Sequence, residues 1–90
     1  MKQKLTSEEY EQIKQLVECA LDSPNKEEAQ KYINKMQSYK YNLCGNASYI
    51  LSELVCYVKD ASGRVTDKER RIYSVKSKLY ELESYGVEKQ

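Results

Sequence analysis

Residues 47–62 of this chain read ASYILSELVCYVKDAS. Their apolar side chains recur at the three- and four-residue spacing of an α-helix. They are Ile50, Leu51, Leu54, Val55, Tyr57, Val58 and Ala61. This stripe is wider than one face of a helix, so more than one neighbour must cover it. We therefore expect residues 47–62 to form the central helix of the fold.

A second apolar stripe precedes the central helix. It consists of Ala29, Tyr32, Ile33, Met36, Tyr39 and Leu43. Ser23 or Asn25 can cap this helix, and Glu27 and Glu28 in its first turn oppose the helix dipole. The pattern predicts a second helix that begins just after Pro24.

Gly45-Asn46 separates these two predicted helices. Gly45 can take the left-handed conformation that ends a helix, and Asn46 can cap the next one. An alternative remains open, because glycine inside a helix costs only about 1 kcal/mol. Residues 24–62 would then form one kinked helix, and its half-covered apolar stripe would favour a homodimer.

The N-terminal segment predicts a helix from its start signal. Thr6 and Glu9 form the pattern of a capping box, in which each side chain accepts a hydrogen bond from the other residue's backbone N–H. Leu5 and Tyr10 flank this cap as a hydrophobic staple. Further apolar residues follow at helical spacing, namely Ile13, Leu16, Val17, Ala20 and Leu21. Pro24 ends the helix, since it disfavours helical geometry at the residue before it.

The C-terminal segment repeats this start signal. Thr66 and Glu69 again predict a capping box, with the helix beginning at Asp67. Its apolar residues follow the 3-4-3 spacing typical of a seam between packed helices. They are Ile72, Val75, Leu79 and Leu82. Gly86 can end this helix.

These segments predict the fold class. Ninety residues form a single helical domain, residues 1–90, because chains divide into separate cores only above about 250 residues. No segment shows the alternation of β-branched residues typical of a strand, and the glycines and the one proline lie at the ends of the predicted helices. We predict an all-α fold, a small antiparallel four-helix bundle.

The composition excludes most catalytic chemistry. The sequence contains no His, so histidine-based triads and His-ligated metals are excluded. Cys19, Cys44 and Cys56 lie too far apart for a zinc motif, and no glycine-rich phosphate loop is present. We therefore predict that the chain is not an enzyme and takes no metal or cofactor.

The cysteines and the N-terminus indicate a compartment. An odd number of cysteines without close spacing favours a reduced chain, in which the thiols act as small core residues. The N-terminus lacks the apolar stretch of a secretory signal, and no apolar run approaches the roughly 20 residues of a membrane span. We expect a cytoplasmic protein.

Charge is distributed unevenly, although the net charge is only +1. Residues 64–78 carry six Lys and Arg against two acids. Four of these cations lie around the start of the fourth helix: Arg64, Lys68, Arg70 and Arg71. Such a cluster can contact an acidic protein surface or a phosphate backbone, or it can be an ordinary solvated helix face.

Tyrosine is the second candidate for a binding role, because all nine aromatic residues are Tyr. Tyr73 and Tyr80 lie two turns apart, beside the apolar seam of the fourth helix, where they can form an exposed patch. Tyr10, Tyr32 and Tyr57 are instead expected in the core, with their hydroxyl groups pointing outward.

These observations favour a role in protein–protein binding. We predict a small helical adaptor, inhibitor or anti-factor, of the kind that phages and mobile elements also encode. Its predicted binding residues are Arg64, Lys68, Arg70, Arg71, Tyr73 and Tyr80. An alternative is a nucleic-acid-binding regulator that reads DNA with the fourth helix. The link from Ser62 to Thr66 is long for a helix-turn-helix, which makes this alternative less favoured.

The layout of the helices resembles the pediocin-type bacteriocin immunity proteins. The shared features are a short first helix, a Pro-marked turn, a long second helix and the stretch from Ala47 to Gly86, in which Arg64-Val65-Thr66 links two amphipathic helices. The resemblance implies a cytoplasmic antiparallel four-helix bundle that protects a cell from its own peptide toxin. It covers most of the chain as a pattern without a diagnostic motif, so it carries over no site residues.

Overall fold

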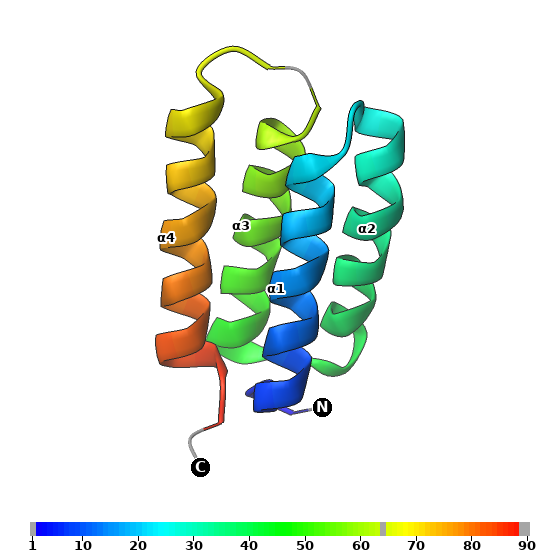
Figure 1. Cartoon of the computed structure of the whole chain (residues 1–90). Helices are drawn as coiled ribbons and strands as arrows, with labels where there is room; N and C mark the ends of the chain where they lie inside the picture. Colours follow the sequence, from blue (N-terminus) through cyan, green and yellow to red (C-terminus); the bar gives the residue numbers. More distant parts are fainter. Residues whose placement is uncertain (1, 64, 89–90) are drawn as a thin grey trace.

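The computed structural model describes residues 2–63 and 65–88. They form four α-helices, α1 (Ser7–Asp22), α2 (Lys26–Ser38), α3 (Gly45–Ala61) and α4 (Lys68–Gly86), with a 3-10 turn η1 (Tyr39–Asn42) between α2 and α3. Consecutive helices run in opposite directions and lie side by side (Figure 1). The described residues contain no β-strand, only two isolated bridges. The predicted all-α four-helix bundle is confirmed.

The start of α1 follows the sequence signal. Thr6 is the N-cap, and the reciprocal bonds of the capping box with Glu9 are both present. Burial alone would raise the pKa of the Glu9 carboxyl, but hydrogen bonds from Lys2 and Thr6 bring that pKa below its usual value. The staple residues Leu5 and Tyr10 are both buried, so the predicted entry into the helix is confirmed.

The residues before α1 join three parts of the chain at one end of the bundle. Leu5 donates its backbone N–H to Gly86 over 2.7 Å and accepts one from Glu88 over 2.8 Å. Lys2 bonds in the same way to Asn42, over 3.0 Å, and to Cys44, over 2.9 Å. This short extended segment therefore fixes the α2–α3 connection and the C-terminal end of α4 against the start of α1.

The connection between α2 and α3 settles the question of one helix or two. Asn25 caps α2, and the α-helix ends at Ser38, where the chain tightens into η1. Gly45 has a φ of +72°, the left-handed conformation that glycine adopts without strain. The alternative of one kinked helix is wrong. Asn46 as N-cap is also wrong, because α3 already begins at Gly45 with Cys44 in that position.

The start of α4 departs from the sequence signal. Asp67 occupies the N-cap position with a φ of 54°, a left-handed conformation, and it makes no side-chain capping bond. The helix begins at Lys68, so the predicted capping box of Thr66 and Glu69 is wrong. The Thr66 carbonyl instead accepts a hydrogen bond from the Arg71 side chain at 3.0 Å, which fixes this turn against the first turn of the helix.

The hydrophobic core centres on α3, as predicted. Seven of its residues are buried, and α1, α2 and α4 all contact it. They are Ala47, Ile50, Leu51, Leu54, Val55, Val58 and Ala61. Tyr10 lies in the core and Tyr32 packs half-buried against it. Tyr57 is exposed, so its predicted core position is wrong.

The cysteines do not act as core residues. Cys19 and Cys56 are exposed and Cys44 is half-buried, and all three are free thiols. The prediction of buried thiols is wrong because other apolar residues already fill the inward faces of α1 and α3. Cys19 and Cys56 lie next to the buried residues Ala20 and Val55 in sequence, and a step of one residue turns a side chain away from the core.

Candidate binding surface

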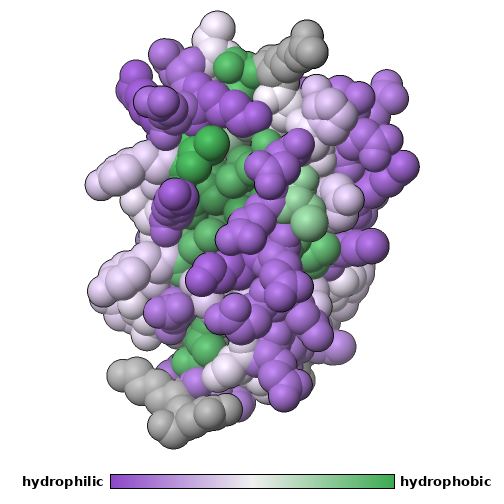
Figure 2. Space-filling model, viewed as in Figure 1, coloured by the Kyte–Doolittle hydropathy of each residue, from purple (hydrophilic) through white to green (hydrophobic). Residues whose placement is uncertain are grey.

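The seam between α1 and α4 is one of sparse helix–helix contact. These two helices contact each other far less than α3 and α4 do. A groove of about 260 Å³ runs along the seam. Its floor is formed by Tyr10, Val17, Leu21, Val75 and Leu79, and its lips by Lys14, Glu18, Lys76, Tyr80 and Glu83. Figure 2 shows apolar side chains between these two helices, bordered on both sides by hydrophilic ones.

Two hydrogen bonds close the ends of this groove and set the register of its helices. At the lower end in Figure 1, the Tyr10 hydroxyl donates to the carbonyl oxygen of Leu79 over 3.2 Å. At the upper end, Lys68 Nζ donates to the carbonyl oxygen of Leu21 over 3.1 Å. The helix between Tyr10 and Leu21 is about 16 Å long at 1.5 Å per residue, which is three turns. The groove is therefore about as long as a three-turn helix.

Tyr10 is held in its neutral form at the lower end. Burial, together with the nearby carboxylates of Glu83 and Glu11, raises the pKa of Tyr10 to about 12. A buried phenol with acids beside it would lose solvation and gain like-charge repulsion on ionising. Tyr10 therefore remains a hydrogen-bond donor throughout the physiological pH range.

The lips of the groove carry charges that the protein leaves uncompensated. The bond between Tyr10 and Leu79 brings these two residues of the antiparallel helices α1 and α4 together. Lys14 lies four residues further along α1, and Val75 lies four residues back along α4. Lys14 is therefore level with Val75 and close to the level of Lys76. Lys14, Glu18 and Lys76 are exposed. Within residues 2–63 and 65–88, none of the three takes part in an ion pair. These side chains are free to rotate away from the floor.

The seam between α3 and α4 has the opposite character. Lys78 of α4 pairs with Glu53 of α3 at 3.2 Å and with Glu81 at 3.0 Å. Hydrogen bonding to Glu81 raises the pKa of Lys78 despite the effect of burial, and Glu53 raises it further. The ammonium group also lies 5.9 Å from the centre of the Tyr57 ring. These contacts cover the seam.

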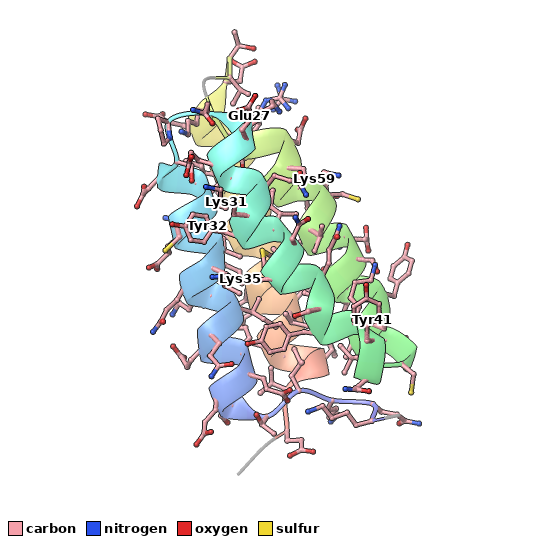
Figure 3. All side chains as sticks on the ribbon, turned by 90° about the vertical axis from the view of Figure 1, so that its right-hand side faces the viewer. Glu27, Lys31, Tyr32, Lys35, Tyr41 and Lys59 are labelled. Carbon is pink, nitrogen blue, oxygen red and sulfur yellow. The ribbon has the colours of Figure 1, made fainter. Side chains whose placement is uncertain are left out.

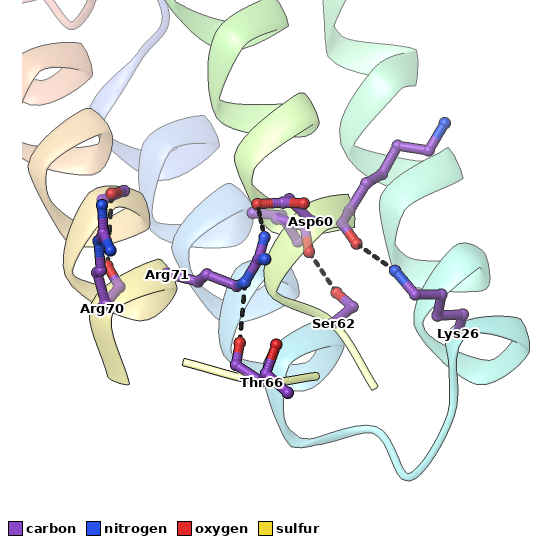
Figure 4. A network of polar contacts seen from close by, with 9 residues as sticks. Lys26, Asp60, Ser62, Thr66, Arg70 and Arg71 are labelled. Carbon is purple, nitrogen blue, oxygen red and sulfur yellow. Dashed lines mark hydrogen bonds and ion pairs between the residues drawn. The ribbon is translucent and has the colours of Figure 1, made fainter. Parts of the chain in front are cut away.

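A second ion pair covers the upper end of the same seam. Arg71 of α4 pairs with Asp60 of α3, and its Nε donates to the Thr66 carbonyl (Figure 4). Beside this pair lies a polar hollow of about 300 Å³, which Arg70 and Asp67 also line. Since both acids and bases line it, it offers no single charge for a ligand to recognise.

The structure separates the residues that the sequence predicted as one site. Lys68 is half-buried and donates to two backbone carbonyls, and Arg71 is held by Asp60. Arg70 is exposed on the polar side of α4. Tyr73 and Tyr80 are 73% and 72% exposed, so the predicted exposed tyrosine pair is confirmed. Arg64 lies outside the described residues.

Sequence reasoning missed the α1 half of the groove. Lys14 and Glu18 lie four residues apart, on the edge of the apolar stripe that includes Val17 and Leu21. Such charged residues beside a stripe are typical of any exposed helix face. The only feature of the sequence that points to the groove is the width of this apolar stripe. The width does not indicate which neighbouring helix covers the edge of the stripe.

The opposite side of α1 offers a poorer site. A larger hollow of about 420 Å³ lies between α1 and α2, but only Leu16 and Tyr39 of its lining are half-buried hydrophobic residues, and most of its other side chains are polar. Lys31 and Lys35 of α2 are exposed on this side of the bundle (Figure 3). Lys31 pairs with Glu28 at 3.5 Å. These lysines provide a matched control surface for the two on the groove.

Over residues 2–63 and 65–88, no three His, Cys, Asp or Glu side chains gather closely enough to hold a metal ion. In that part of the chain, no helix has the length and apolar character needed to cross a bilayer. Neither a family model, nor a curated protein, nor a solved structure matches the chain.

Proposed function

We propose that the protein acts by binding another protein, and that it does so along the α1/α4 groove. The observation that carries this proposal is an apolar seam that the bundle leaves poorly covered. A groove with an apolar floor and polar lips is the usual receptor for an amphipathic helix. Tyr80 extends the surface, because an exposed tyrosine offers a large contact area at low entropic cost.

The lips support this proposal because nothing holds them in place. A docking segment must move Lys14 and Lys76 aside to reach Val17 and Leu79. Neither lysine has an ion pair to lose within the described residues. Opening the α3/α4 seam would instead break the pairs of Lys78 and Arg71. Binding along α1/α4 therefore costs less than binding on the other side of α4.

The nucleic-acid alternative has less support. Helix-turn-helix motifs cross their two helices at a steep angle, whereas α3 and α4 lie side by side and antiparallel (Figure 1). Lys68 and Arg71, two of the cations proposed to reach phosphate, bond within the protein. Anisotropy titration with duplex DNA tests this alternative, because phosphate contacts weaken steeply with added salt.

The proposal is tested by affinity capture with two matched double variants. Lys76→Ala/Tyr80→Ala alters the groove lip, and Lys59→Ala/Tyr49→Ala makes the same two changes at exposed positions of α3. Partners captured by the wild type are identified by mass spectrometry and then purified for direct binding measurements. We expect the purified partner to lose affinity at least about tenfold for the lip variant alone, which corresponds to about 1.4 kcal/mol. Equal binding to wild type and lip variant, with matching circular dichroism, overturns the proposal.

A further inference from the structure

We propose that the occupant of the α1/α4 groove is an amphipathic helix with acidic side chains in its central turn and basic side chains towards both ends. This inference rests on the proposed function and adds the chemistry of the partner. It follows from where the four charged residues of the lips lie along the groove.

The centre of the groove is positive on both lips. Lys14 on α1 and Lys76 on α4 line the same cavity at nearly the same height, because the bonds of Tyr10 and Lys68 fix the register. Two ammonium groups on opposite lips repel each other. A carboxylate of the occupant placed between them attracts both at once. The occupant is therefore acidic where it passes this point.

The lip residues towards both ends of the groove are negative, and the Lys68 ammonium at the upper end is held by the carbonyl oxygens of Leu21 and Gly63. Glu18 lies one turn above Lys14 on α1, about 6 Å along the axis, and Glu83 lies two turns below Lys76 on α4, about 10 Å away. Each carboxylate lies on a lip, where it meets the flank of a docked helix. From the upper end to the lower end, the charges of the lip side chains are thus negative, positive and negative. The complementary helix is basic, acidic and basic over about three turns.

A second copy of this chain fits the groove less well. The most exposed ridge of α4 carries Arg70, Tyr73, Lys76 and Tyr80. If this ridge entered the groove of another copy, its cations would approach the two lysines of the lips. Like charges in contact suppress association. A partner of different charge pattern is therefore favoured over a second copy that docks through this ridge.

Two synthetic peptides of identical composition test the inference on the full-length protein. Both form amphipathic helices of about three to four turns with the same apolar stripe. The acid-centred peptide has Glu in its central turn and Lys at both ends, and the base-centred peptide has the two exchanged. Fluorescence anisotropy should show at least about tenfold tighter binding of the acid-centred peptide. Raising the salt concentration should reduce the difference in affinity between the two peptides.

Matched variants show where the preference arises. In Lys14→Glu/Lys76→Glu the preference should reverse in favour of the base-centred peptide. Lys31→Glu/Lys35→Glu makes the same charge change on α2. In this variant the preference for the acid-centred peptide should remain.

Failure of this inference differs from failure of the proposed function. If both peptides bind equally and Lys76→Ala/Tyr80→Ala weakens both, the charge pattern is wrong while docking in the groove stands. If the α2 variant reverses the preference, the site is wrong. If neither peptide binds, the inference is overturned, and the protein-binding function is judged by the capture of its partner alone.

Discussion

Helix α4 packs against two neighbours in two different ways. Towards α3, its apolar residues are covered by Lys78 with Glu53 and by Arg71 with Asp60. Towards α1, its apolar residues form the floor of a groove whose charged lips have no partners within residues 2–63 and 65–88. The two seams belong to one helix and one core, so the difference lies in the side chains at their edges.

The comparison separates the effect of edge side chains on stability from their effect on access to the apolar residues below. An exposed ion pair contributes little to stability, typically 0 to about 1 kcal/mol. Its effect on access is larger, because it holds two long side chains over the apolar residues below. A seam without such pairs loses little stability, and its lips can move to admit a partner.

Truncating a leucine in each seam should give the largest difference between them. Leu82 is fully buried, whereas Leu79 is 9% exposed and lies in the groove. We expect Leu82→Ala to lower the free energy of unfolding by about 2–5 kcal/mol and Leu79→Ala to lower it clearly less, because the open site can relax. Urea denaturation measures both. A greater loss for Leu79→Ala would contradict the contrast between the seams.

Gly86 tests how tightly α4 approaches α3. A Cβ at this position would lie 2.7 Å from Leu82 Cδ1 and 3.1 Å from Ala47 Cβ. Although alanine favours helix, Gly86→Ala should cost about 1–3 kcal/mol through overpacking. Ser84→Ala, at an exposed position of the same helix, is the control. Stabilisation by Gly86→Ala in thermal unfolding would show that the closed seam is loosely packed.

Tyr10 tests the lower end of the open seam. Tyr10→Phe removes the hydrogen bond to the Leu79 carbonyl and should cost about 0.5–1.5 kcal/mol at neutral pH. Because folding raises the pKa of Tyr10 from 10.0 to about 12, the wild type should also lose stability as the pH rises between these values. The difference between wild type and variant isolates Tyr10 from the other tyrosines. A difference that stays constant from pH 9 to 12 would contradict the assignment.

Lys14→Glu should give the α1/α4 seam an ion pair like those that cover the α3/α4 seam. Of these substitutions in the two seams, this one should change the free energy of unfolding least. The new carboxylate faces Lys76 across the groove and can form the ion pair that this seam lacks. We expect a gain of 0 to about 1 kcal/mol, lost at high salt, and weaker binding of any groove ligand. Lys31→Glu on α2 is the control for net charge. Because the new carboxylate also lies one turn from Glu11 and Glu18, the change is repeated in a Lys76→Ala background. An effect on stability that is the same in both backgrounds would show that the two lips do not face each other.

The four helices could be predicted because their signals are local. The capping box of Thr6 and Glu9 needs only four residues, and it formed as expected. The same pattern at Thr66 and Glu69 did not form, because side chains of the first turn of α4 hold this turn through other contacts, one of them to α1. Lys68 reaches the Leu21 and Gly63 carbonyls, and Arg71 reaches the Thr66 carbonyl. Local propensity is weak against such contacts.

The candidate site could be predicted only in part. Tyr73 and Tyr80 were placed correctly on the surface because they lie beside the seam of one helix. Which cations would remain free could not be predicted, since Lys68 and Arg71 are engaged by groups distant in sequence or on another element. The groove itself depends on how far α1 lies from α4. That spacing is set by the packing of all four helices, and no pattern within one helix records it.

The most direct test of the central claim is a methyl NMR titration with the acid-centred peptide, in which both seams are observed in one spectrum. We predict that shift changes concentrate at Val17, Leu21, Val75 and Leu79, while Leu54 and Val58 of α3 stay unchanged. Changes concentrated at α3 and the Lys78 side of α4, with the groove methyls unmoved, would contradict the account.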